Sequence, residues 1–177
     1  MTKPMLVESG ANLSLIAASL ASLDAEERGA DALASMLGVV RPDAWPPEFN
    51  GPETRAWMRH VLVSHPDQPG YGSWYLVADG RLTGICGYKG PPNEAGEVEI
   101  GYSVVASEQR KGFATAAVGL LVARAFRDAT VTAVAAETLP SLTASQTVLS
   151  RNGFVLVSRR ADDELGEVLR YVLRRAE

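Results

Sequence analysis

Apolar and polar residues alternate with two different periods along this chain, and the change of period marks the predicted elements. In the N-terminal third, apolar residues recur every three or four positions, as in helices that bury one face. From Ser73 onward, runs rich in β-branched and aromatic residues are typical of strands. The pattern predicts strands over residues 5–8, 73–79, 82–90, 97–105, 131–138, 154–160 and 167–175. It predicts two helices within residues 13–37 and further helices over residues 53–63, 113–127 and 141–151.

Capping and turn residues divide these elements. Asp24, with Glu27 three positions later, resembles a capping box and predicts the start of the second helix. Gly38 predicts the end of that helix, and the proline-rich segment RPDAWPPEFNGPE after it predicts a loop. The pair Asp79-Gly80 lies between two strand-like runs and predicts a hairpin.

The order of these elements predicts the fold class. Helices come first, then a run of strands, and then strand, helix, strand, helix and two closing strands. This order favours an α/β fold with a mixed sheet over a regular doubly wound sheet. A chain of 177 residues suits one domain and can bury a sizeable core. We therefore predict a single domain over residues 1–177.

Composition narrows the class of partners. The net charge of −4 argues against nucleic acid as the main partner, because that affinity comes largely from lysine and arginine. No apolar run approaches the roughly 20 residues that span a bilayer, so we expect no membrane partner. Cys86 is the single cysteine, which forbids an internal disulfide and fits a reducing, cytoplasmic setting. Two histidines and one cysteine make no metal site.

The segment QRKGFAT, residues 109–115, joins a predicted strand to a predicted helix. A helix start has unpaired amides and a partial positive charge, and it suits the oxygens of a phosphate. Gly112 and Ala114 are small enough to let an anion approach the backbone, and Arg110 and Lys111 add positive charge. The segment is therefore either a pyrophosphate site or a helix start with a solvated basic end. It is neither a Walker A loop nor a G-x-G-x-x-G fingerprint.

Two longer stretches resemble a known family. EIGYSVVASEQRKGFATAAVGLL resembles the acyl-CoA-binding segment of the GNAT N-acetyltransferase superfamily, whose motif is Q/R-x-x-G-x-G/A. Gln109, Gly112 and Ala114 occupy the fixed positions of that motif. ETLPSLTASQTVLSRNGF resembles a later segment of the branch that includes the ribosomal-protein N-terminal acetyltransferases. The resemblance covers roughly residues 74–174 and implies an acyl-CoA N-acyltransferase fold, with splayed central strands and flanking helices.

The resemblance also implies where acetyl-CoA, the expected cosubstrate, would bind. In this fold two neighbouring parallel strands splay apart and the pantetheine arm lies between them. The backbone groups that pair with the arm would come from Ser103, Val104 and Val105. The diphosphate would bind at Gln109, Arg110, Lys111, Gly112, Phe113, Ala114 and Thr115. Arg151 would approach the nucleotide end, or is a solvated charge at the end of a helix.

Acetyl transfer to an amine requires a base for the amine and stabilisation of the leaving thiolate. Glu97 and Glu99 alternate on one face of a predicted strand, and related enzymes often place a carboxylate that acts through water at Glu99. The other interpretation is a solvated strand face. Many family members have a tyrosine acid at the position of Leu149, so that acid is absent here. The ribosomal branch instead has a serine at the position of Ser145, which would bond the sulfur or its own helix backbone.

Other residues bear on the acceptor side. Leu142 stands where relatives often have an asparagine that bonds pantetheine, and Glu137 stands where close relatives often have histidine. With Glu97 and Glu99, Glu137 predicts an electronegative acceptor side that favours a cationic amine. Three aromatic residues fall in the region that borders the acceptor site in this family, where they line a pocket or pack in the core. They are Trp45, Phe49 and Trp57.

The sequence therefore predicts an acetyl-CoA-dependent N-acetyltransferase, acting by direct attack in a ternary complex. The acceptor would be a primary amine of a small molecule, an amino acid or a protein N-terminus. The alternative is a non-catalytic GNAT-like module that binds acyl-CoA as a sensor or partner. We expect a monomer or a homodimer.

Overall fold

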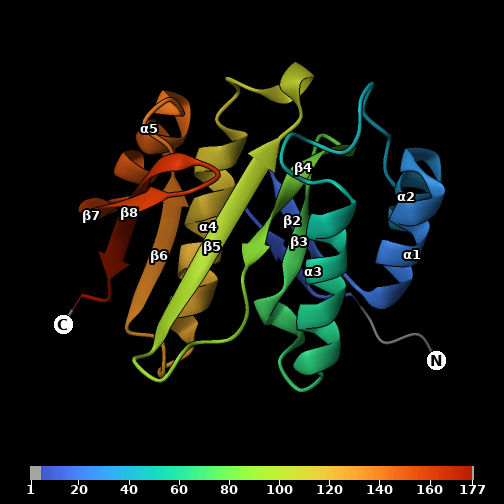
Figure 1. Ribbon diagram of the computed structural model, residues 1–177. Helices are drawn as coiled ribbons and strands as arrows, with labels where there is room; N and C mark the ends of the chain where they lie inside the picture. Colours follow the sequence, from blue (N-terminus) through green and yellow to red (C-terminus); the bar gives the residue numbers. More distant parts are fainter. Residues whose placement is uncertain (1–4, 177) are drawn as a thin grey trace.

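A sheet of eight strands forms the centre of the molecule (Figure 1). The structure is a computed structural model and describes residues 5–176. Its strand order is β1-β2-β3-β4-β5-β6-β8-β7. Within this described range, the pair β5–β6 is parallel and the other neighbours are antiparallel. The strands are β1 (Val7–Ser9), β2 (Ser14–Ala17), β3 (Ser73–Ala78), β4 (Arg81–Tyr88), β5 (Glu97–Val104), β6 (Ala133–Thr138), β7 (Val155–Asp162) and β8 (Gly166–Arg174).

Helices cover both faces of the sheet. Successive residues of a strand point to opposite faces of the sheet, and each face has its own buried cluster. Tyr75 and Ile85 belong to one cluster, and Trp74 and Leu76 belong to the other. The first cluster lies under α1 (Leu20–Arg28), α2 (Ala30–Leu37) and α3 (Pro52–Ser64). The second lies under α4 (Phe113–Arg127) and α5 (Thr143–Arg151). Figure 1 shows α3 in front of the sheet and α4 behind it.

The two central strands separate before they end. Parallel pairing of β5 with β6 runs from Glu97–Ala133 to Ile100–Ala136. β5 then continues to Val104 without a partner on that side within the described residues, while its other side stays paired with β4. The splayed central strands that the sequence resemblance implied are therefore present, and the fold class is confirmed.

The first predicted helix is wrong at its start. Residues 14–17 form strand β2, and Leu13, Leu15 and Ala17 are buried in the manner of a strand. A short apolar run fits both periods, so its pairing with β3 decides its structure. Helix α1 begins after Ser19, whose hydroxyl accepts from the amide of Ser22 at 3.1 Å.

Asp24 and Glu27 consequently lie inside α1 and do not start a second helix. Both carboxylates instead bond Arg59 of α3, at 2.7 and 3.1 Å. The second helix begins after Gly29 and ends at Gly38 in the left-handed conformation, as predicted for Gly38. Elsewhere the predicted strands and helices match the structure to within a few residues. In the part of the chain that is described, no helix has the length and apolarity needed to cross a membrane.

Candidate functional site

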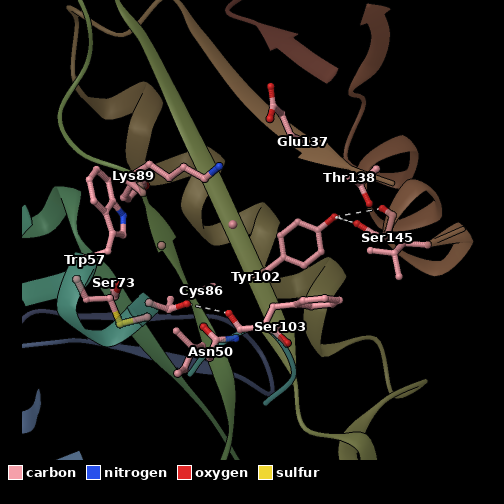
Figure 2. A pocket seen from close by; sticks show the side chains of 18 of the residues that line it. Asn50, Trp57, Ser73, Cys86, Lys89, Tyr102, Ser103, Glu137, Thr138 and Ser145 are labelled. Atoms are coloured by element: carbon pink, nitrogen blue, oxygen red, sulfur yellow. Dashed lines mark hydrogen bonds between the residues drawn. The ribbon is translucent and has the colours of Figure 1, made fainter. Parts of the chain in front are cut away.

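A cavity of about 420 Å³ lies where β5 and β6 separate (Figure 2). Its walls come from β4, β5 and the end of β6, from α3 and α5, and from the loop before α3. Gly101 lies on its wall, and a Cβ added there would meet nothing within 4 Å. The cavity therefore opens through the sheet at the point where the parallel pairing stops.

Three hydroxyl groups gather on the side of the cavity that faces α5. If the parallel pairing continued past Ile100–Ala136, Tyr102 would lie opposite Thr138. The hydroxyl of Tyr102 lies 2.8 Å from Ser145 Oγ and donates to Ser145 O at 3.1 Å. Figure 2 shows Tyr102 pointing toward Ser145, with Thr138 beside it. Burial raises the pKa of Tyr102 to about 12, so its phenol keeps its proton at neutral pH.

Charged residues occupy the opposite face of the sheet. Glu99 forms an ion pair with Lys89, and Arg170 Nη1 lies 3.7 Å from Glu99 Oε2. Arg170 also forms an ion pair with Glu97 and lies 3.3 Å from Glu137. Of these residues, Lys89 and Glu137 line the cavity.

These ion pairs correct the predicted electronegative acceptor side. Each of the three glutamates has at least one cationic partner, and Arg160 bonds Glu137 at 2.8 Å. Burial alone would raise the pKa of Glu137, but the hydrogen bond and charge of Arg160, with Lys89 nearby, hold it below its ordinary value. The sequence could not reveal Arg160 and Arg170, because only the strand order β6-β8-β7 brings their strands close to Glu97 and Glu137.

The backbone groups that face the gap alternate along β5. Lys89 N donates to Glu99 O, and Val105 N donates to Thr83 O at 2.9 Å. In an antiparallel ladder the groups of every second residue point to the same neighbour. Ser103 and Val105 therefore bond β4, and the groups that face β6 are those of Tyr102 and Val104. The structure thus places the gap-facing groups at Val104, as expected, and at Tyr102 in place of Ser103 and Val105.

The start of α4 has the geometry of an anion site. Gly112 adopts φ 82° and Arg110 φ 64°, so the turn before the helix passes twice through the left-handed region. Among the described residues, no hydrogen-bond acceptor is found for the amides of residues 110–115. A Cβ added at Gly112 would meet nothing within 4 Å, so space for a ligand lies above these amides. The donor set therefore fits a diphosphate.

Side chains around this turn hold it in place. Gln109 Nε2 donates to Val104 O at 3.0 Å and thereby ties the turn to the end of β5. Lys111 Nζ lies 2.8 Å from Glu108, so part of its charge is neutralised. Asn152 Nδ2 donates to Thr115 O at 3.2 Å, which brings the end of α5, where exposed Arg151 lies, against the first turn of α4.

The loop before α3 forms the outer wall on the acceptor side. Ser103 Oγ donates to Glu48 O at 2.8 Å and ties this loop to β5. Phe49 is 65% exposed and adopts φ 66°, while Trp57 of α3 is 47% exposed, and both line the cavity. Trp45 instead donates its indole N–H to Glu26 at 3.0 Å and packs on Tyr75, away from the cavity lining.

Sequence reasoning missed three residues of this site. Tyr102 carries no motif signal beyond its place in EIGYSV, and its role depends on the register of β5 against β6. Thr138 likewise depends on that register, and Lys89 depends on the turn that follows β4. Leu142 and Leu149 stand where the family pattern has polar side chains. Leu142 lines the cavity and Leu149 is fully buried, so neither position supplies the polar group that the pattern has there.

Comparison with known proteins places this geometry in a family. Residues 18–155 match the family described as Acetyltransferase (GNAT) domain. A curated relative, the uncharacterized N-acetyltransferase YjdG of Bacillus subtilis (strain 168), is 29% identical over 142 residues, covering 79% of this chain and 84% of that protein.

Solved structures share the fold. An apo structure of RimL, a ribosomal L7/L12 alpha-N-protein acetyltransferase, superposes with a TM-score of 0.72 at 18% identity, covering 99% of this chain and 97% of that one. The microcin C7 self-immunity acetyltransferase MccE, in complex with acetyl-CoA and AMP, gives a TM-score of 0.70 at 14% identity, covering 94% of each chain.

Proposed function

The chain belongs to the GNAT acetyltransferase family, and from that premise we propose that it transfers the acetyl group of acetyl-CoA to a primary amine by direct attack in a ternary complex. The proposal treats the whole chain as one such domain. The observation that carries it is the cavity at the β5–β6 gap, which joins the hydroxyl groups beside α5 to the loop before α3. MccE, a structural neighbour, is known in complex with acetyl-CoA.

The cosubstrate would extend from the start of α4 into the gap. The diphosphate would bind the free amides of residues 110–115, with Arg110, Lys111 and Arg151 adding positive charge. The pantetheine arm would pair with the gap-facing groups of Tyr102 and Val104, in the manner of an added strand. The thioester would then reach the point where β5 and β6 meet, beside Tyr102 and Ser145.

The reaction moves one proton from nitrogen to sulfur. The lone pair of the amine forms a C–N bond to the thioester carbon, and the carbonyl electrons move onto oxygen. When the carbonyl re-forms, the C–S bond breaks and the thiolate leaves. The nitrogen loses its proton, the sulfur gains one, and the products are the N-acetyl amide and CoA.

We assign the proton transfers to two side chains, Glu99 and Ser145. Glu99 would accept the proton through water. The cationic nitrogen of the adduct is a much stronger acid than a free ammonium, so a carboxylate is a sufficient base for its proton. Ser145, with its hydroxyl bonded to Tyr102, would donate to the sulfur as the C–S bond breaks.

The acceptor would enter from the α3 side, past Phe49 and Trp57. RimL is described as acting on a ribosomal protein N-terminus, and the paired charges of this site do not favour a polycation. We therefore propose a primary amine that carries an apolar or aromatic group, either a small molecule or the N-terminus of a peptide.

A thiol-release assay tests the proposal. We expect release of CoA from acetyl-CoA with aromatic or aliphatic primary amines or N-terminal peptides, and weaker release with polyamines or aminoglycosides. Ser145→Ala and Glu99→Gln should each lower kcat by about 100-fold without loss of CoA binding. Tight CoA binding without turnover on any class of amine would instead identify the non-catalytic module.

A further inference from the structure

Thr138 has a hydroxyl group that the fold leaves without a partner. It is the last residue of β6 and is 6% exposed. Across residues 5–176, its Oγ1 is the one buried side-chain nitrogen or oxygen that forms no hydrogen bond. A buried polar group without a partner destabilises a protein, so such a group usually has a ligand or a function.

The position of Thr138 points to a ligand. Thr138 is one of the residues that line the cavity, and it lies two pairs beyond the last paired residues of β5 and β6, Ile100 and Ala136. Val134 and Ala136 face the α4 side of the sheet, and alternation places Thr138 on that side, where Ser145 and Tyr102 lie. Those two hydroxyl groups bond each other, whereas that of Thr138 has a proton and nothing to receive it.

We propose that the hydroxyl of Thr138 donates a hydrogen bond to the carbonyl oxygen of the acetyl thioester. This inference rests on the proposed function. A cosubstrate that runs from the start of α4 along β5 ends where the strands meet, and that is the position of Thr138. The thioester has two polar atoms, its sulfur and its carbonyl oxygen. The Tyr102–Ser145 pair would bond the sulfur, which leaves the carbonyl oxygen for Thr138. The carbonyl oxygen gains negative charge when the amine attacks, and a donor already in place stabilises that charge. No proton leaves Thr138 in this step.

Thr138→Val tests the contact, because valine keeps the shape and removes the hydroxyl. We expect kcat to fall about 100-fold, and the affinity for acetyl-CoA to fall about fivefold, while the affinity for CoA, which lacks the carbonyl, is unchanged. The Tm of the free protein should stay the same or rise, since the unpaired group is gone. Thr138→Ser should restore most of the activity.

Thr83→Val is the matched control. Thr83 is also a buried threonine, on β4, but its hydroxyl donates to Leu76 O at 3.2 Å. Removal of a satisfied hydroxyl should lower Tm and leave kcat unchanged. Thr138→Val should therefore lower kcat without lowering Tm, and Thr83→Val should lower Tm without lowering kcat.

Three outcomes would overturn the inference. Thr138→Val could lower Tm as Thr83→Val does and keep full activity, which would make the residue structural. It could weaken CoA as much as acetyl-CoA, which would place the contact on the sulfur or the arm. Finally, wild type and Thr138→Val could bind acetyl-CoA with equal affinity, which would reject the contact. This measurement needs no turnover, so it stays decisive even if the wild type shows no turnover and the proposed function fails.

Discussion

Tyr102 supplies a phenol to a site where this chain lacks the tyrosine of the family pattern. Leu149, at the usual position of the tyrosine acid, is fully buried in the core. Tyr102 lines the cavity from strand β5 and bonds both the hydroxyl and the carbonyl of Ser145. We infer that the pair acts as one proton-donating unit, with Tyr102 orienting the hydroxyl of Ser145.

Tyr102→Phe should therefore lower kcat by about tenfold or more, with the KM for acetyl-CoA little changed. Because the two hydroxyl groups act together, adding Ser145→Ala should cost less than the product of the two single effects. Steady-state kinetics on the four proteins measures this. Tyr71→Phe is the control, since its hydroxyl bonds Asp128 at 2.6 Å and it does not line the cavity. Fully additive effects would contradict the paired role.

Helix α4 contributes its first turn to the site. Gly112 has a left-handed backbone conformation and open space above it, so a side chain there is strained but meets no atom within 4 Å. Asn and Asp tolerate this conformation better than other residues do. The two side chains are nearly isosteric and differ in charge, which separates backbone strain from electrostatics.

Gly112→Asp should weaken CoA binding by at least tenfold relative to Gly112→Asn, because its carboxylate would face the diphosphate. Both variants should lose similar stability. Isothermal titration with CoA measures the affinity, and added salt should narrow the difference between the variants. Equal affinities for the two variants would place the phosphates elsewhere.

In the loop before α3, the effect of backbone strain on stability can be separated from the effect of a side chain on amine binding. Phe49 adopts φ 66°, a backbone conformation that phenylalanine rarely takes. The residue is 65% exposed and lines the cavity. Strain of this kind often marks a functional position.

Phe49→Gly should hold or raise Tm, because glycine adopts this conformation freely. It should also raise the KM for an aromatic amine and leave the KM for acetyl-CoA unchanged. Phe49→Ala, which keeps the strain, should show the same KM at a lower Tm. An unchanged amine KM in both variants would remove Phe49 from the acceptor site.

The elements were largely readable from the sequence, and the site was readable only in part. The start of α4 was predictable because glycine, small residues and cations lie together in the chain. Strand β2 was not, because its run of apolar residues fits both periods and its pairing with β3 decides it. Predicting that Tyr102 lies opposite Thr138 needs the register of two strands whose paired residues lie far apart in the sequence. The partners Arg170 and Arg160 need the strand order β6-β8-β7, and the partner Lys89 needs the turn after β4.

At the scale of the whole molecule, ion pairs join the first strand to the helix behind the sheet. Glu8 of β1 lies 3.0 Å from Arg124 of α4 and also forms an ion pair with Arg127. Burial alone would raise the pKa of Glu8, but the hydrogen bonds from Arg127 and Arg124 hold it below its ordinary value of 4.5. Glu26 has the opposite behaviour, since burial raises its pKa.

Glu8→Gln should therefore reduce stability in a pH-dependent way. A lowered folded pKa contributes stability that is complete above the ordinary pKa and is lost as the pH falls through the folded value. The Tm deficit of the variant should be full at pH values above the ordinary pKa of 4.5 and should shrink as the pH falls below that value. Thermal unfolding across this range measures it. The exposed Glu94→Gln should show no such trend, and a Glu8→Gln deficit that persists at low pH would contradict the assignment.

The separation of β5 from β6 also divides the sheet mechanically. Four residue pairs join the half that contains β1–β5 to the half that contains β6–β8. Each half keeps its own antiparallel ladder, so a small rigid swing about this seam changes the width of the gap without breaking a ladder. Helix α4 packs beneath both halves and limits that swing. We therefore expect a ligand that fills the gap to contact both halves of the sheet and to restrain their movement relative to each other.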